Sequence, residues 1–249
     1  MTKTIIFDLD GTLTESKSAL TPDMGALLAR LLEKMPVAIM SGGSYAQFER
    51  QFLGNMPVGT HLTNLYLFPT SAAQCYVWKD GAWEHLYNNP LTPEEKSRVL
   101  AALAAALHET GLDVPPPQLW GEQTEDRGSQ ITWSSLGQQA PIEEKKAWDP
   151  DQKKRRPLQA ALLRRLPDFS VRVNATNSVD ITRAGLDKAY GVRKFSEIIA
   201  TPIADMLYVG DGLFVGGNDE IVKETGIPTE AVTGPADTAK IIERLLPNA

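Results

Sequence analysis

The chain has 249 residues, 42% hydrophobic and 22% charged, a composition ordinary for a soluble globular protein of one large or two modest domains. Its formal net charge of -6 argues against nucleic acid as a partner, because a phosphate backbone is bound by a basic face. No stretch is apolar enough to predict a membrane span, and Cys75, the single cysteine, excludes an internal disulfide and fits a reducing, cytoplasmic setting.

The first predicted element is a short buried strand that ends in two carboxylates. The apolar run Ile5-Ile6-Phe7 is followed by Asp8 and Asp10, and Gly11 then predicts a sharp turn. Both acids are therefore expected at the carboxyl end of a strand, where open α/β sheets bind ligands.

Two like charges this close repel, so one of the two must bind a cation or hold a proton. Either outcome suits phosphoryl transfer, since a metal-bound Asp8 can attack phosphorus and Asp10 can carry a proton to or from the departing oxygen. The alternative for this pair alone is a strand end followed by an ordinary Asp-Gly turn.

A second strand is predicted over Val37–Met40, followed by the turn Ser41-Gly42-Gly43-Ser44 and a helix from Tyr45 to Phe52. Exposed backbone N–H groups and hydroxyls at a helix start can hold phosphate oxygens. A merely structural turn is the alternative for these four residues taken alone.

Further strands are predicted over residues 62–67 and 75–78, with a hairpin turn at Lys79-Asp80-Gly81, before Asn88-Asn89-Pro90 breaks the pattern. Strands then alternate with two helices up to about residue 185. We therefore expect a core over 1–87 and 186–249 with an inserted α+β domain over 88–185. Within that insert, the Lys153–Arg156 run is predicted to be a solvated face of a helix.

The core resumes near Lys188 and reaches another buried strand at Leu207-Tyr208-Val209. This strand ends in Gly210-Asp211, and Asn218-Asp219 follows. Because Mg²⁺ prefers oxygen ligands, Asp8, the Asp10 carbonyl and Asp211 are predicted to hold it, with Asp219 as an outer acid or additional ligand.

Four segments together resemble the motifs of the haloacid dehalogenase superfamily of phosphotransferases, in order. They are Asp8-Leu9-Asp10-Gly11-Thr12, Ser41, Lys188, and Gly210-Asp211 with Asn218-Asp219. The resemblance implies a doubly wound, mainly parallel, Rossmann-like α/β core and a type IIB α+β cap. It also implies an aspartyl-phosphate intermediate on Asp8, with Asp10 as general acid/base, and a phosphoryl group held by Ser41 and Lys188. The residues Gly42 and Gly43 complete that phosphate loop.

The cap resembles that of sugar-phosphate phosphatases and eukaryotic-type phosphomannomutases. Asp126-Arg127-Gly128-Ser129 is similar to a mutase strand that carries a phosphate-binding Arg, and Ser178-Val179-Asp180 is similar to a sugar-contacting segment. The resemblance therefore implies that Arg127, Ser178 and Asp180 bind a phosphosugar. By analogy with the family, a cap-to-cap homodimer is the expected assembly.

This chain departs from the mutase pattern in its cap. Where that pattern has a second Arg, this chain has Ser134, and a third Arg is replaced around Gln139–Ile142. Arg–phosphate hydrogen bonds are strong and directional, so these losses weaken a second phosphate site. Arg127 and Arg183 remain, and Lys145-Lys146 could compensate.

The resulting prediction is a Mg²⁺-dependent phosphatase of a sugar phosphate, a hydrolase that acts through a phosphorylated Asp8. The alternative is a phosphohexomutase that interconverts hexose 1- and 6-phosphates. A third hypothesis, a phosphosugar-binding protein without catalysis, is disfavoured because a binder does not require Asp8, Asp10, Lys188 and Asp211 together.

Overall fold

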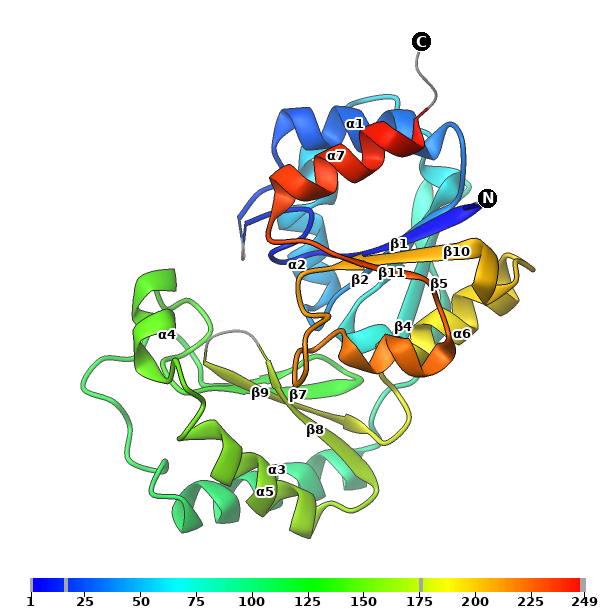
Figure 1. The fold of residues 1–249 in the computed structure, drawn as a ribbon. Helices are drawn as coiled ribbons and strands as arrows, with labels where there is room; N and C mark the ends of the chain where they lie inside the picture. The colour runs from blue at the N-terminus through cyan, green and yellow to red at the C-terminus, as the bar shows by residue number, and fades with distance from the viewer. Residues whose placement is uncertain (1, 16–17, 175–176, 247–249) are drawn as a thin grey trace. The chain divides into compact units, whose positions relative to one another are not determined.

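The computed structural model describes residues 2–15, 18–174 and 177–246 (Figure 1). Two compact units make up the chain. The first combines the residues up to Asn88 with those from Asp187 onward, and the second runs from Asn89 to Leu186. The second unit is thus an insertion in the sequence of the first. None of the helices in the described residues is long and apolar enough to cross a membrane.

A seven-stranded sheet in the order β11-β10-β1-β2-β3-β4-β5 forms the centre of the first unit. The strands from β11 to β3 run parallel, and β4 and β5 are antiparallel. This confirms the predicted doubly wound, mainly parallel α/β core. The strands are β1 (Thr4–Asp8), β2 (Val37–Met40), β3 (Leu65–Phe68), β4 (Gln74–Lys79), β5 (Ala82–Asn88), β10 (Met206–Gly210) and β11 (Thr229–Ala231).

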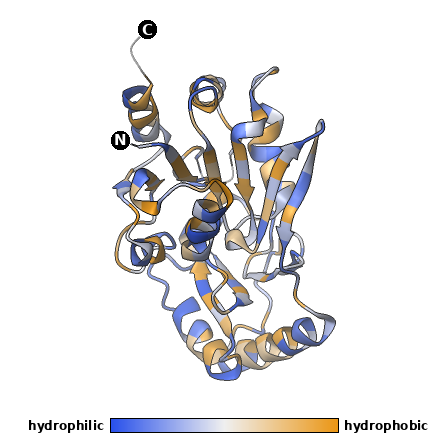
Figure 2. Ribbon diagram, turned by 90° about the vertical axis from the view of Figure 1, so that its right-hand side faces the viewer, coloured by the Kyte–Doolittle hydropathy of each residue, from blue (hydrophilic) through white to orange (hydrophobic). Residues whose placement is uncertain are grey.

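Helices cover both faces of this sheet because successive residues of its strands point to opposite sides. Ile5 and Phe7 of β1 pack in one core with α1 (Pro22–Leu32), α2 (Tyr45–Gln51) and α7 (Pro235–Leu245). Ile6 packs in the other core with α6 (Lys188–Ile198). Figure 2 shows the central strands as the most hydrophobic part of this unit. Each fully buried side chain of this kind stabilises the fold by about 1.5–3 kcal/mol.

The second unit contains an antiparallel sheet in the order β6-β7-β9-β8. Its helices α3 and α5 pack against one face, where side chains such as Leu103 and Leu158 contact a core that includes Ile131 and Val179. The elements are α3 (Pro93–Glu109), β6 (Thr124–Asp126), β7 (Gln130–Ser134), α4 (Ile142–Trp148), α5 (Arg155–Arg165), β8 (Phe169–Asn174) and β9 (Ser178–Arg183).

The prediction that Lys153–Arg156 is a solvated face is wrong for Arg155. This side chain is 2% exposed and donates its Nε–H to Asp149 Oδ2 over 2.8 Å. The Asp149 carboxylate also accepts the backbone N–H groups of Lys154 and Arg155, so it caps the start of α5. Because the buried Arg155–Asp149 ion pair is supported by these additional hydrogen bonds, the Arg155 side chain lies in the interior although it belongs to a basic run.

Candidate active site

The carboxyl ends of β10, β1 and β2 gather the predicted motifs at one edge of the core sheet. In the β1–β2 register Asp8 lies opposite Met40, so Ser41 is the next residue on the neighbouring strand. On the other side of β1, Phe7 lies opposite Val209, and Gly210-Asp211 follows directly. The sheet reverses its winding direction between β1 and β10, and such a switch point is where doubly wound folds bind ligands.

Lys188 connects the two halves of the site. It is the first residue of α6, whose N-cap is Asp187, and its ammonium donates hydrogen bonds to Asp8 Oδ1 and Asp219 Oδ1. The Lys188, Asp8 and Asp219 side chains are 3%, 4% and 0% exposed. The structure therefore brings a predicted nucleophile, a cation and an acid from distant parts of the chain into one buried cluster.

The donor set fits a divalent cation. Carboxylate oxygens of Asp8, Asp211 and Asp219 lie within 4.8 Å of one another. Asp8 Oδ2 is buried and has no hydrogen-bond partner within residues 2–15, 18–174 and 177–246. One ammonium among three carboxylates leaves an excess of negative charge, and an unpaired buried anion is costly unless a cation or a proton offsets it. These are hard oxygen ligands of the kind Mg²⁺ prefers.

The pKa shifts in this cluster follow from burial and crowding. Burial raises the pKa of Asp8 well above its usual value, although the positive charge of Lys188 acts in the opposite direction. Burial, together with the negative charge of Asp219, raises the pKa of Asp211 to about 6. Burial alone would lower the pKa of Lys188, but the charges of Asp219 and Asp8 outweigh it and raise that pKa. Lys188 is therefore protonated at neutral pH.

Two glycines let the acids approach this closely. A Cβ at Gly11 would lie 2.3 Å from Asp211 Oδ2, and the φ of +82° at Gly11 is itself unfavourable for other residues. A Cβ at Gly210 would lie 2.4 Å from Asp219 Oδ2. Each glycine thus marks a point where a backbone and a site carboxylate meet.

The Asp10 carboxylate is held by two amides that the sequence analysis missed. Gln47 Nε2 donates to Asp10 Oδ2 over 3.0 Å, and Gln51 Nε2 donates to Asp10 Oδ1 over 2.9 Å. Gln51 also donates to Thr14 Oγ1 over 2.6 Å. The two glutamines are four residues apart on α2, a spacing that places them on the same helix face and could have pointed to a shared partner.

The predicted phosphate loop follows β2 directly. The Ser41 hydroxyl is 3.0 Å from the Gly43 backbone nitrogen, which donates to it, and Ser41 is buried. A Cβ at Gly43 would lie 2.5 Å from the Gln47 side chain, so a larger residue there would disturb the glutamine that holds Asp10. The loop and the Asp10 contacts are therefore coupled.

The predicted sugar-binding residues share the polar face of the sheet in the second unit. Ser178 and Asp180 are two residues apart on β9, and Asp180 Oδ1 accepts a hydrogen bond from Thr132 Oγ1 over 2.8 Å. The Arg127 guanidinium donates to Glu125 Oε2 from Nε over 2.9 Å and from Nη2 over 2.7 Å. The sequence analysis missed Glu125, which offsets the charge of Arg127.

The cations proposed as substitutes for the missing arginines have contacts of their own. Arg183 donates to Glu95 and to the Pro90 carbonyl, and Lys146 pairs with Glu143 over 3.3 Å. Lys145 is buried, and its Nζ donates to the Gln138 carbonyl over 3.0 Å. The Ser134 hydroxyl is also buried and has no hydrogen-bond partner among the described residues.

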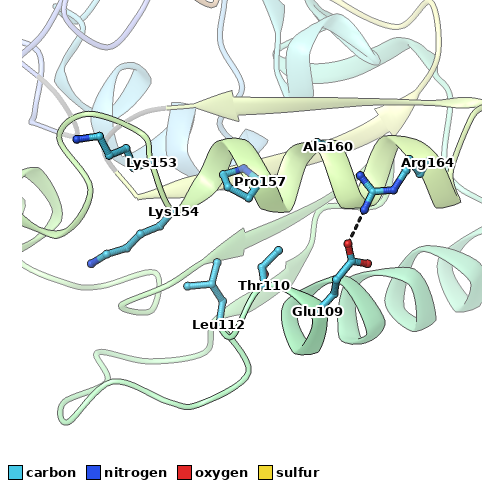
Figure 3. Close-up of a pocket in the computed structure, with 8 residues that line it drawn as sticks. All are labelled: Glu109, Thr110, Leu112, Lys153, Lys154, Pro157, Ala160 and Arg164. Carbon is cyan, nitrogen blue, oxygen red and sulfur yellow. Dashed lines mark hydrogen bonds and ion pairs between the residues drawn. The ribbon is translucent and has the colours of Figure 1, made fainter.

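A cavity of about 430 Å³ in the second unit lies between α3 and α5 (Figure 3). Its charged lining residues are engaged locally: Arg164 contacts Glu109, Lys153 pairs with Asp151, and Lys154 donates to the Trp148 carbonyl. None of the predicted site residues lines this cavity, so it does not belong to the predicted phosphosugar site.

The core topology and the motifs at its carboxyl edge define a member of the haloacid dehalogenase superfamily. The model of the family described as eukaryotic phosphomannomutase matches residues 24–248, and the chain belongs to that family. It is therefore an enzyme, and the predicted superfamily resemblance is confirmed.

Curated relatives of similar length carry the same name. The phosphomannomutase of Spinacia oleracea is 27% identical over 242 residues, which cover 94% of this chain and 92% of the relative. The phosphomannomutase of Saccharomyces cerevisiae is 25% identical over 248 residues, which cover 97% of this chain and 93% of the relative.

Solved structures agree on the fold. A haloacid dehalogenase-like hydrolase from Bacteroides thetaiotaomicron superposes with a TM-score of 0.62 at 17% identity, covering 98% of this chain and all of that one. The IMP-nucleotidase of Plasmodium falciparum bound to IMP superposes with a TM-score of 0.73 at 13% identity. The superposition covers 97% of this chain and 67% of that one. At these identities the likeness concerns the fold alone.

Proposed function

We propose that this chain is a phosphohexomutase of the phosphomannomutase type, which moves a phosphoryl group between two positions of a hexose through a phosphorylated Asp8. The buried contact of Lys188 with both Asp8 and Asp219, beside Asp211, is the observation that carries the phosphoryl-transfer part. Membership of the phosphomannomutase family supports the mutase over the hydrolase that we predicted first.

Binding comes first in the proposed mechanism. The Ser41 hydroxyl, which accepts the Gly43 backbone N–H, would donate its own proton to the transferring phosphoryl group beside Asp8. An ammonium has three N–H donors, and Lys188 uses two of them on Asp8 and Asp219. The third would donate to a phosphoryl oxygen and offset charge there as the reaction proceeds.

The chemical step is an in-line displacement at phosphorus. A carboxylate oxygen of Asp8 forms the new P–O bond as the bond to the sugar oxygen breaks, and Asp10 gives that departing oxygen its proton. The Gln47 and Gln51 amides would hold the Asp10 carboxyl group in place for this transfer. A well-placed general acid contributes roughly 10²–10⁴-fold to the rate.

The return step uses the same groups in reverse. Asp10 removes the proton from the free hydroxyl of a hexose monophosphate, and that oxygen takes the phosphoryl group from Asp8 to give a hexose bisphosphate. The bisphosphate, turned around in the site, then returns its other phosphoryl group to Asp8 by the first step and leaves as the isomeric monophosphate. Asp8, Asp211 and the Asp10 carbonyl would hold Mg²⁺, with Asp219 beside them, and a bound Mg²⁺ would supply further positive charge next to the phosphoryl oxygens.

A phosphatase is the second candidate because of two features of the second unit. A mutase must also hold the phosphate that is not reacting, yet Glu125 neutralises Arg127, and Ser134 stands where the mutase pattern has an Arg. In a phosphatase, water would take the phosphoryl group from Asp8 while Asp10 accepts the water proton.

Incubation of the Mg²⁺-loaded protein with mannose 1-phosphate, with and without a hexose 1,6-bisphosphate, separates the two. Mannose 6-phosphate whose formation depends on the bisphosphate supports the mutase. Stoichiometric free phosphate without mannose 6-phosphate supports the phosphatase and contradicts the mutase. A chain that turns over no member of a hexose-phosphate panel contradicts both.

A further inference from the structure

The Tyr208 side chain is a fourth member of the buried cluster. Its hydroxyl donates to Asp219 Oδ1 over 2.7 Å, the same oxygen that accepts from Lys188. Tyr208 and Asp219 are both 0% exposed. Tyr208 lies in the middle of β10, in an apolar strand whose other side chains only fill the core.

Asp219 is held on both of its oxygens. Oδ1 accepts from Lys188 and Tyr208, and Oδ2 accepts the Gly212 backbone N–H over 3.1 Å. A carboxylate fixed at both oxygens has little freedom to rotate. Its position in turn determines where the Lys188 ammonium lies between Asp219 and Asp8.

We propose that Tyr208 is a positioning residue for Lys188 and acts through Asp219. The inference rests on the proposed role of Lys188 in binding the phosphoryl group. Because Tyr208 satisfies part of the Asp219 charge, the ammonium is shared with Asp8 rather than drawn fully to Asp219. Its third N–H is thereby directed at the phosphoryl group, and removal of the Tyr208 hydroxyl would move the ammonium toward Asp219.

Tyr208→Phe tests this proposal, since phenylalanine keeps the ring that fills the core. The matched control is Tyr87→Phe, which also removes a tyrosine hydroxyl hydrogen bond, from Tyr87 to the Ala72 carbonyl over 2.9 Å. Inorganic phosphate binding to each Mg²⁺-loaded protein is titrated calorimetrically. We expect phosphate to bind about tenfold more weakly to Tyr208→Phe and within about twofold of wild type to Tyr87→Phe.

Phosphate affinity that is unchanged in Tyr208→Phe overturns the proposal, as does an equal loss in Tyr87→Phe. A second comparison starts from Asp219→Asn. If Tyr208 acts through Asp219, adding Tyr208→Phe to Asp219→Asn changes phosphate affinity no further, whereas additive losses overturn the proposal. Both comparisons read phosphate binding alone, so a wild-type protein that binds phosphate but turns over no phosphosugar contradicts only the proposed function.

Discussion

Lys188 and Asp8 lie 180 positions apart in the sequence, and the ammonium of the first donates a hydrogen bond to the carboxylate of the second in a buried setting. The whole second unit lies between them in the chain. The contact forms because α6 begins at Lys188 and packs on the sheet that β1 belongs to. It joins the two halves of the core at the point where we place the chemistry.

Lys188→Met should therefore affect both catalysis and stability. Without the ammonium, turnover should fall by about 10²–10³-fold, because one donor to the phosphoryl oxygens is lost. The free energy of unfolding of the metal-free protein should fall by about 3–5 kcal/mol, since Asp8 and Asp219 are left buried without their partner. Denaturant titration and steady-state kinetics measure the two effects. A variant as stable and active as wild type would show that the buried contact is incidental.

The carboxylate cluster predicts stabilisation by Mg²⁺. A chelator should abolish turnover, and saturating Mg²⁺ should raise the melting temperature, because a ligand that binds only the folded state stabilises it. In Asp211→Asn the rise in melting temperature should be lost. Asp205→Asn is the matched control, since that acid pairs with the exposed Lys3 away from the site. An Asp211→Asn protein with the wild-type response to Mg²⁺ would contradict the site.

Gln51→Leu should impair the general acid selectively. Loss of the Gln51 amide removes one of the hydrogen bonds that hold the Asp10 carboxyl group, so kcat/KM for mannose 1-phosphate should fall by about tenfold or more. The kcat/KM for p-nitrophenyl phosphate should change by less than about twofold, because nitrophenolate leaves without needing a proton. If both substrates lose the same factor, Gln51 does not act through Asp10.

The Glu95–Arg183 pair in the second unit predicts a dependence of stability on pH. The hydrogen bond from Arg183 lowers the pKa of Glu95 from 4.5 to about 2. Because of the lowered pKa, Glu95 loses its proton at a lower pH in the folded state than in the unfolded state. The pair therefore stabilises the fold above pH 4.5. That contribution is lost as the pH falls toward 2.

Glu95→Gln keeps the side-chain oxygen that accepts the Thr92 backbone N–H at the start of α3 but removes the charge. It should cost about 1 kcal/mol or less at pH 7, as expected for a partly exposed pair, and the difference from wild type should vanish near pH 2. The control is Glu144→Gln, at an exposed acid of the same unit, which should leave the free energy of unfolding unchanged at every pH. A difference for Glu95→Gln that grows on acidification would contradict this reading.

Local patterns predicted the core strands and the acids at their ends, and the superfamily resemblance added Lys188. Three apolar residues before Asp8, and a similar strand before Asp211, indicate strand ends, and parallel strands place such ends at one edge. The start of α1 follows the same kind of local rule, since Thr21 before Pro22 is a typical N-cap and its hydroxyl accepts the Met24 N–H. The strand ends and the helix start depend on short-range sequence, so this one sequence is enough to predict them.

Some residues have a sequence context that indicates only a structural role, and their contacts at the predicted sites could not be predicted in this way. Tyr208 reads as a core residue of a strand, and only the folded chain brings its hydroxyl to Asp219. Glu125 reads as a surface acid, but the β6 hairpin sets it against Arg127. The helix α4 was missed because its Glu143–Lys146 segment has no apolar stripe from which a helix could be read. The contacts of Tyr208 and Glu125 depend on partners that only tertiary packing brings together.

The most direct test of the central claim is a search for phosphate bound covalently to Asp8. The Mg²⁺-loaded protein is mixed with mannose 1-phosphate or a hexose 1,6-bisphosphate, quenched in acid within a single turnover, digested and examined by mass spectrometry. We predict one added phosphoryl group on the peptide that contains Asp8, and none in Asp8→Asn. Product formed without phosphate on that peptide, or with phosphate on another residue, would contradict the account.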